Sequence, residues 1–405
     1  MKNLARALAL LASATLATAC SDQPTAPTGS TPTGVEATAS LGRHQDAGAT
    51  ASWNELATSL ADRTPIDAAR LYAYLSMAQF RASEAADEGH HGRPHSRWFR
   101  RHYRDHLAIS AAIGGASAVV LHAFFPNNGP EIDAALAAQA AAAPDDDDFV
   151  ESADLGADVA AEVMAYAAGD RVGLADPGTP PLGDGFWKWP GPPAPIVRAL
   201  YRARPFFLSS DSQYRPAPAP AFGSPAYLTA LGEVRQISDT RTPEQLAIAT
   251  YWNLQQSGRR NAPFENKAVE LIRKYRVSDA LAARIMFTMN AAMFDAVIGC
   301  FDAKYAYWFI RPPQADPAIT TPVGLPPHPS YPSAHSCVSG SMSGVLMAYF
   351  PREAANLEAM SQEASLSRLY AGIHYRFDME AGIALGRRVA QKALRTHLDN
   401  VAVMP

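Results

Sequence analysis

The chain has 405 residues, of which 48% are hydrophobic and 18% are charged. Such a chain can bury a sizeable core, so it is not an intrinsically disordered protein, and its length suits one large domain or two smaller ones. The net charge of −4 provides no overall basic field for a nucleic-acid partner. Any anion site must therefore be built locally.

The N-terminus has the layout of an export signal. Two basic residues precede an apolar run over 7–16, and small residues lead to Cys20, which predicts a signal peptide over 1–19 that is too short to be a permanent span. Residues 17–20 resemble a bacterial lipobox, in which the cysteine is lipidated. Ordinary cleavage just before Cys20 is the alternative. Either reading predicts export to the periplasmic or cell-surface side.

A flexible tether follows the signal. Residues 20–50 are rich in Pro, Thr and Gly, and such a composition does not pack a core. We expect the folded domain to occupy 51–405. Beyond the signal, no apolar stretch is predicted to be long enough to cross a membrane, so the membrane is expected as a partner only through a lipid on Cys20.

The domain is predicted to be all-α. Apolar residues recur with helical period over 71–88, and 109–125 reads as a more fully apolar helix. The acidic run 145–148 is expected to begin a further helix or to decorate a loop. Few segments alternate with the period of a strand. We therefore expect a bundle of helices.

Two further signals mark the middle of the chain. Residues 183–222 are dense in proline and aromatic side chains, which predicts an ordered but irregular segment that lies over the helices. Thr242 followed by Pro243 predicts the start of another helix. Later in the chain, Cys300 and Cys337 are either bonded or two buried free thiols.

Three C-terminal segments carry chemistry-bearing residues. In the first, KYAYWFIRP, Lys304 and Arg311 are seven residues apart, so on a helix they would project from nearly the same face. Pro312 then forbids a regular continuation. Like charges on one face cost free energy unless an anion lies between them.

The second segment is PPHPSYPSAHSCVSG, in which prolines form a stiff lead to Ser333. Ser333 stands where a helix is expected to begin, so its hydroxyl and the neighbouring backbone N–H groups can meet an anion. His335 follows two residues later and can give or take a proton there.

The third segment is SRLYAGIHYRFD. Arg368 adds a planar fork of donors, and Gly372 permits a change of direction before His374. Asp378 is one turn further on, where it can orient the ring of His374 or pair with a cation. Together the three segments hold cations, a hydroxyl and two histidines, an inventory that fits one oxyanion.

Each of these residues alone has a plainer structural explanation, as a solvated charge, a helix cap or a satisfied buried polar group. Their joint order is K-x6-RP, then PSxH, then SR-x5-H-x3-D, over 304–378. This order resembles the signature of the phosphatidic acid phosphatase type 2 and vanadium-dependent haloperoxidase superfamily. The chain is most similar to bacterial haloperoxidase-like lipoproteins of that group.

The resemblance implies a helical bundle in which the three segments meet around vanadate or phosphate. It implies that Lys304, Arg311 and Arg368 neutralise the oxygens, with further hydrogen bonds from Ser333 and the amide of Ala334. It makes His335 the acid/base and His374 either the ligand of vanadium or the phosphate nucleophile. The family usually has glycine where Ala334 stands, so its methyl group is a departure from the pattern.

Two reactions fit such a site. A haloperoxidase holds vanadate and uses hydrogen peroxide to oxidise a halide to hypohalous acid. An acid phosphatase needs no vanadate and hydrolyses a phosphate ester through a phosphohistidine. A surface lipoprotein that kept the fold only for binding is a third possibility, which the complete set of site residues disfavours.

Three features of the resemblance favour the haloperoxidase. The helical region before Lys304 is longer than small secreted phosphatases need, and 183–222 looks like the matching region of bacterial haloperoxidase homologues. By the family pattern, bromoperoxidases carry a histidine at the position of His328, where fungal chloroperoxidases carry phenylalanine, so bromide is the expected halide. His328 is alternatively only a polar loop residue.

Overall fold

The structure is a computed structural model that describes residues 48–91, 98–143, 146–189, 200–253 and 262–399. The predicted signal peptide, its Cys20 and the tether up to residue 47 lie outside these residues. Ala49 and Thr50, the last residues of the predicted tether, are already helical and buried.

The described residues fold into helices and irregular loops, without a β-strand, which confirms the all-α prediction. A single isolated bridge joins Phe186 to Phe309. The elements in chain order are α2 Ala49–Arg63, α3 Ala68–His91, α4 Trp98–Phe124, η1 Pro126–Asn128, α5 Gly129–Ala141, α6 Asp146–Ala167, α7 Pro225–Thr240, α8 Pro243–Tyr251, α9 Ala262–Lys274, α10 Asp279–Tyr307, α11 Pro312–Ala315, α12 Ala334–Tyr349, η3 Pro351–Glu353, α13 Ala354–Tyr370 and α14 Arg376–Asp399.

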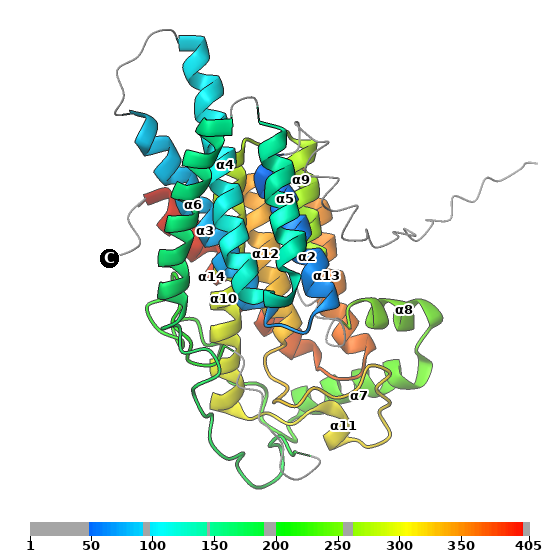
Figure 1. Ribbon diagram of the computed structural model, residues 1–405. Helices are drawn as coiled ribbons and strands as arrows, with labels where there is room; N and C mark the ends of the chain where they lie inside the picture. Colours follow the sequence, from blue (N-terminus) through cyan, green and yellow to red (C-terminus); the bar gives the residue numbers. More distant parts are fainter. Residues whose placement is uncertain (1–47, 92–97, 144–145, 190–199, 254–261, 400–405) are drawn as a thin grey trace, which may run out of the picture.

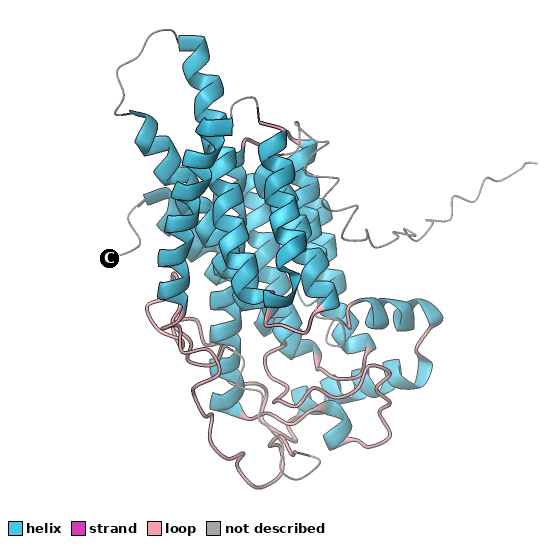
Figure 2. Cartoon of the chain, in the orientation of Figure 1, coloured by secondary structure: helices cyan, strands magenta, loops and turns pink. Residues whose placement is uncertain are grey.

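The long helices run side by side as a bundle, with α7, α8 and α11 beside one end of it (Figure 1). Within the bundle, α12 packs against α10, α13 and α14. The loops that connect to α11 and α12 gather at the same end as α7 and α8 (Figure 2). This end is where the C-terminal sequence segments meet.

Most helices that the sequence predicts are present. The apolar periodicity of 71–88 lies within α3, and the acidic run leads into α6 at Asp146. Thr242 caps α8 by accepting from the N–H of Gln245, whose side chain bonds back to the N–H of Thr242. This reciprocal capping box satisfies donors that the first helical turn leaves open.

The close contact of α14 with the start of α12 depends on glycine. A Cβ on Gly382 would lie 2.7 Å from the carbonyl oxygen of Ser333 and 2.7 Å from the Cβ of Ser336. Any larger residue would push α14 away from Ser333. The absence of a side chain therefore allows α14 to approach the segment that begins α12.

The described part of the proline-rich and aromatic segment 183–222 forms no helix, as predicted, and is fixed to α10. The carboxylate of Asp295 accepts hydrogen bonds from the backbone N–H groups of 206–208 at 2.7–2.9 Å. Earlier in the segment, the N–H of Trp187 donates to the carbonyl of Trp308 at 2.7 Å. The segment thus holds the chain where it leaves α10.

Two described helices are long and apolar enough to cross a membrane, so the prediction that no such stretch follows the signal was wrong. They are His106–Phe124 within α4 and Asp279–Tyr307, which is α10. Their apolar windows are 67% and 83% buried inside the protein. Their hydrophobic length reflects a place in the interior of the bundle, where a helix can be apolar all round.

Cys300 and Cys337 are buried free thiols, which decides between the two alternatives that the sequence left open. The thiol of Cys300 lies 3.8 Å from the carbonyl oxygen of Pro332. Burial raises the pKa of Cys337 well above its ordinary value. Both residues therefore act as small apolar side chains between α10 and α12.

The buried carboxyl of Glu265 should make the stability of the fold depend on pH. Burial raises the pKa of Glu265 to about 8, against a smaller opposing effect of the Asn290 side chain. The folded state therefore keeps a proton that the unfolded state loses, so stability falls as pH rises from the unfolded pKa near 4.5 towards 8.

We expect Glu265→Gln to flatten this decline by up to about 1.4 kcal/mol per pH unit. Urea unfolding of both proteins between pH 5 and 8 would measure the two slopes. Glu270→Gln, which changes an exposed carboxylate of the same helix paired with Lys267, is the matched control. Identical slopes for Glu265→Gln and the wild type would contradict the prediction.

Candidate active site

Lys304 lies near the C-terminal end of α10 and is fully buried. Its ammonium group donates hydrogen bonds to the carbonyl oxygens of Pro329 and Ser330, both at 2.8 Å. The lysine thus holds the proline-rich loop that precedes α12. Burial, together with a smaller contribution from the charge of Arg311, lowers the pKa of Lys304 to about 8.

Arg311 does not share a helix face with Lys304, so the spacing argument for these two residues was wrong. Helix α10 ends at Tyr307, and Trp308 takes a left-handed conformation with φ 50°. The chain turns there, four residues before Pro312. The two cations approach each other through the fold of the loop rather than through a helical repeat.

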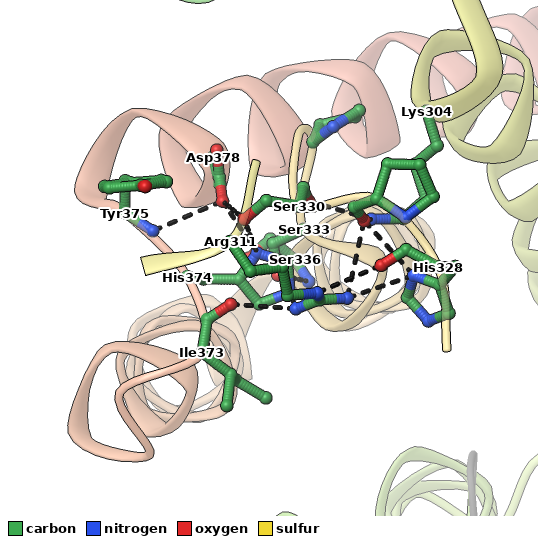
Figure 3. A network of polar contacts seen from close by, with 12 residues as sticks. Lys304, Arg311, His328, Ser330, Ser333, Ser336, Ile373, His374, Tyr375 and Asp378 are labelled. Atoms are coloured by element: carbon green, nitrogen blue, oxygen red, sulfur yellow. Dashed lines mark hydrogen bonds and ion pairs between the residues drawn. The ribbon is translucent and has the colours of Figure 1, made fainter. Parts of the chain in front are cut away.

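The guanidinium of Arg311 is buried and surrounded by acceptors (Figure 3). Its Nε donates to the carbonyl of His328 at 3.0 Å and Nη1 to that of Ile373 at 2.8 Å. Nη2 lies 3.1 Å from Nδ1 of His328 and 3.4 Å from the carbonyl of Pro329. Nη1 also lies 3.2 Å from Nε2 of His374. Arg311 therefore joins the second and third sequence segments.

His374 lies between Arg311 and Asp378 (Figure 3). Its Nδ1 is 2.8 Å from Oδ2 of Asp378, which is one of the two pairings that the spacing allows, although His374 itself precedes α14. Gly372 makes the turn into this position with φ 73°, and an added Cβ would meet the carbonyl oxygen of Thr320 at 2.7 Å. The turn is therefore specific for glycine.

These contacts assign the protons of His374. The carboxylate of Asp378 can only accept a hydrogen bond, so Nδ1 of His374 donates to it and carries the ring hydrogen. The other nitrogen, Nε2, then directs its lone pair at the N–H of Arg311. Burial, followed by the charges of Arg311 and Lys304, holds the pKa of His374 well below its ordinary value. The ring is neutral, with a nucleophilic nitrogen directed at the arginine.

Ser330 completes the support of this pair, although no sequence motif marks it as a site residue. Its hydroxyl donates to Oδ2 of Asp378 at 2.5 Å and lies 3.5 Å from Nδ1 of His374. Oδ2 also accepts from the N–H of Tyr375 at 3.2 Å. Burial raises the pKa of Asp378 to about 6, against the lowering effects of these bonds and of the cations. No spacing rule marks a serine between two prolines for this role.

Ser333 acts as the N-cap of α12, so the plainer explanation of this residue, a helix cap, holds. Its hydroxyl accepts from the N–H of Ser336 at 3.4 Å, and its own N–H donates to the carbonyl of Asp378 at 2.9 Å. The hydroxyl hydrogen can still be donated to another group. Ala334 is the first residue of α12 and is partly exposed.

His335 and Arg368 both contact the end of α8. His335 is partly exposed, and its Nε2 lies 2.8 Å from the carbonyl oxygen of Trp252. Arg368 is buried and donates to the carbonyl of Ala249 at 2.8 Å and to the hydroxyl of Ser367 at 2.9 Å. Burial lowers the pKa of Arg368 to about 9, and the charge of Arg311 adds to the effect.

The three segments predicted from the sequence therefore lie together. Among their predicted site residues, positive side chains outnumber negative ones. Lys304, Arg311 and Arg368 are buried cations, and Asp378 is the carboxylate among the predicted site residues. Burying cations without matching anions is costly. An oxyanion is the group that would compensate them.

The region that holds the three segments also matches a known protein family. Residues 283–402 match the family model of the PAP2 superfamily. Residues 283–402 therefore form a region of the PAP2 superfamily. The matched PAP2 region runs from near the start of α10 through α14 and includes every residue of the signature. No curated protein matches the chain significantly.

Solved structures extend the likeness to most of the chain. A bacterial vanadium-dependent iodoperoxidase is 25% identical, with a TM-score of 0.66 over 86% of this chain and 95% of that one. Two structures of bacterial vanadium-dependent chloroperoxidase, apo-type and holo-type, are each 14% identical and have TM-scores of 0.62 and 0.60. They cover 81% and 91% of this chain, and 94% and 97% of their own. The bundle is thus the fold of vanadium haloperoxidases.

The residues of this site suit an oxyanion better than a metal cation. No group of three or more His, Cys, Asp or Glu side chains could hold a metal ion in the part of the chain that the structure describes. Three buried cations and the Nε2 lone pair of His374 are instead donors and a nucleophile for a phosphate-like group. The donor set therefore fits vanadate or phosphate.

Removing either buried arginine should weaken anion binding. We expect Arg311→Ala and Arg368→Ala each to reduce the affinity for orthovanadate or inorganic phosphate by about 1.5–3 kcal/mol, the scale of a hydrogen bond to a charged group. Isothermal titration calorimetry would measure this loss. Arg235→Ala, which removes an exposed arginine paired with Asp239 and Asp316, should bind as the wild type does. Unchanged affinity in both buried variants would place the anion elsewhere.

Proposed function

We propose that the protein is an exported vanadium-dependent haloperoxidase that oxidises a halide, with bromide preferred, to hypohalous acid by means of hydrogen peroxide. The observation that carries the proposal is the neutral ring of His374, held by Asp378 at Nδ1 and directed at Arg311 through Nε2. The likeness to bacterial vanadium haloperoxidases over 86% of the chain supports the choice of reaction.

Vanadate would be held by Lys304, Arg311 and Arg368, with His374 Nε2 as its protein ligand and further bonds from Ser333 and the amide of Ala334. When bound, it supplies the activation of peroxide. The N–H groups of Arg311 are engaged by protein acceptors, including His374 Nε2 at 3.2 Å. Binding at Nε2 therefore requires Arg311 to exchange this contact for an oxygen of the anion, which costs little because both partners are acceptors.

His335 would move the proton of the reaction. It is the partly exposed histidine of the site, whereas His374 is 2% exposed. A histidine near the solvent side can exchange protons with water at neutral pH, whereas the buried ring of His374 stays neutral. The two histidines therefore have separate roles.

The preference for bromide rests on His328. Its ring is buried, with the centroid 5.3 Å from that of Phe301, and Nδ1 lies 3.1 Å from Nη2 of Arg311. His328 is thus next to the proposed anion site rather than a polar group on an open loop. Its position supports a role beside the halide.

An acid phosphatase is the second candidate, because the PAP2 match covers the same residues. In that reaction Nε2 of His374 attacks the phosphorus of a phosphate ester and the ester oxygen leaves with a proton from His335. Water then releases phosphate from the phosphohistidine. The cationic residues would keep the same roles, and vanadate would be an inhibitor.

The two reactions can be separated with the full chain reconstituted with orthovanadate. We expect vanadate-dependent bromination of a phenolic dye, loss of this activity to background in His374→Ala, and an unchanged circular dichroism spectrum. Hydrolysis of a chromogenic phosphate ester would be measured in parallel on the same chain without vanadate, because vanadate would inhibit that reaction. Rapid ester hydrolysis with an acid-trapped phosphohistidine at position 374, and no halide oxidation, would refute the haloperoxidase.

We also propose that the protein is tethered outside the cytoplasm through lipidated Cys20. The apolar run that ends in small residues at Cys20, followed by a linker rich in Pro, Thr and Gly, supports this. Cys20→Ser should move the protein from the membrane fraction to the soluble exported fraction. Absence of labelled fatty acid from the wild type would replace anchoring by simple secretion.

A further inference from the structure

The hairpin of α7 and α8 lies beside one end of the bundle (Figure 1), and the end of α8 contacts two residues of the site. Two backbone carbonyls there accept from site side chains. The carbonyl of Ala249 accepts from Nη2 of Arg368, and that of Trp252 lies against Nε2 of His335, both at 2.8 Å. The last carbonyls of a helix have no donor within the helix, so they are available for such contacts.

The contact with Ala249 orients the fork of Arg368. A second bond from Nε to the hydroxyl of Ser367, at 2.9 Å, holds the other edge of the same guanidinium. The C-terminal end of a helix carries a partial negative charge, which favours a cation there. The end of α8 thus fixes both the position and the plane of a buried cation of the site.

The contact with Trp252 decides which nitrogen of His335 carries hydrogen. A carbonyl oxygen only accepts, so Nε2 of His335 must donate to it. The neutral ring then has its lone pair on Nδ1. Proton transfer by His335 therefore takes place at Nδ1, and the hairpin determines this tautomer.

Two side chains dock the hairpin on α13. Arg241, between α7 and α8, donates from Nε to the carbonyl of Tyr370 at 2.6 Å and from Nη2 to that of Thr320 at 2.9 Å. The indole N–H of Trp252 donates to Oε1 of Glu363 at 2.9 Å. Tyr370 is the last residue of α13, so Arg241 also holds the start of the turn that leads to His374.

We propose that Arg241 and Trp252 are positioning residues, which dock the α7–α8 hairpin on α13 so that its backbone carbonyls orient Arg368 and keep the hydrogen of His335 on Nε2. Neither residue is among those proposed to bind the anion. The chemical roles of Arg368 and His335 rest on the proposed function, whereas the docking and the tautomer do not.

The tautomer can be measured by NMR on protein labelled with ¹⁵N in its histidine rings, with the His335 signals assigned by their loss in His335→Gln. We expect the Nε2–H tautomer in the wild type and a mixture of tautomers in Arg241→Met and in Trp252→Phe. Calorimetry should show a Kd for orthovanadate that is about five- to tenfold higher in Arg241→Met, the scale of one lost hydrogen bond that orients an arginine.

Matched variants separate positioning from general damage. Glu363→Gln keeps an acceptor for the indole N–H and should retain the wild-type tautomer, whereas Glu363→Ala should not. Arg235→Met removes an arginine of α7 that bonds Asp239 and Asp316 instead of α13, and should leave both readouts unchanged. Because Glu363 is exposed, its variants test the proposal even if Arg241→Met does not fold.

The positioning role would be overturned if Arg241→Met and Glu363→Ala fold and both keep the wild-type tautomer of His335 and the wild-type affinity for vanadate. A tautomer that depends on Arg241 and Glu363, in a protein with neither halide oxidation nor ester hydrolysis, would support the positioning role while refuting the proposed function. The positioning role is therefore tested by the tautomer and the vanadate affinity, whereas the proposed function is tested by halide oxidation and ester hydrolysis.

Discussion

The burial of three cations beside one carboxylate is the constraint on which the site depends. Lys304, Arg311 and Arg368 are each at most 1% exposed, and an ionised group is costly to remove from water. The structure meets part of this cost with backbone carbonyls, to which all three side chains donate. The remaining positive charge is what an oxyanion would compensate in the proposed function.

The same contacts explain why the loops around the site are ordered without regular secondary structure. Lys304 binds the carbonyls of the loop before α12, and Arg311 binds carbonyls on both that loop and the turn after α13. Each cation therefore serves as a cross-link between segments distant in sequence. In the proposed function, anion binding would draw on the same donors that hold these loops.

His374 and His335 show how one ring type acquires two roles from its surroundings. His374 is buried, has a carboxylate at Nδ1 and stays neutral, so it suits bonding to the anion. His335 is partly exposed and bonds a backbone carbonyl through Nε2, so it suits proton transfer through its other nitrogen. In the proposed function, the environment and not the residue type would separate the ligand from the acid/base.

The sequence by itself determined the all-α class, the cap at Thr242, the turn at Gly372 and the pairing of His374 with Asp378, because each depends on residues within a few positions of one another. The tertiary structure alone decided that Arg311 leaves the helix of Lys304, that Ser330 supports Asp378, and that α8 holds His335 and Arg368. These contacts join segments up to 119 residues apart, as between Ala249 and Arg368. Several use backbone carbonyls, which every residue carries, so no residue type in the sequence can reveal them.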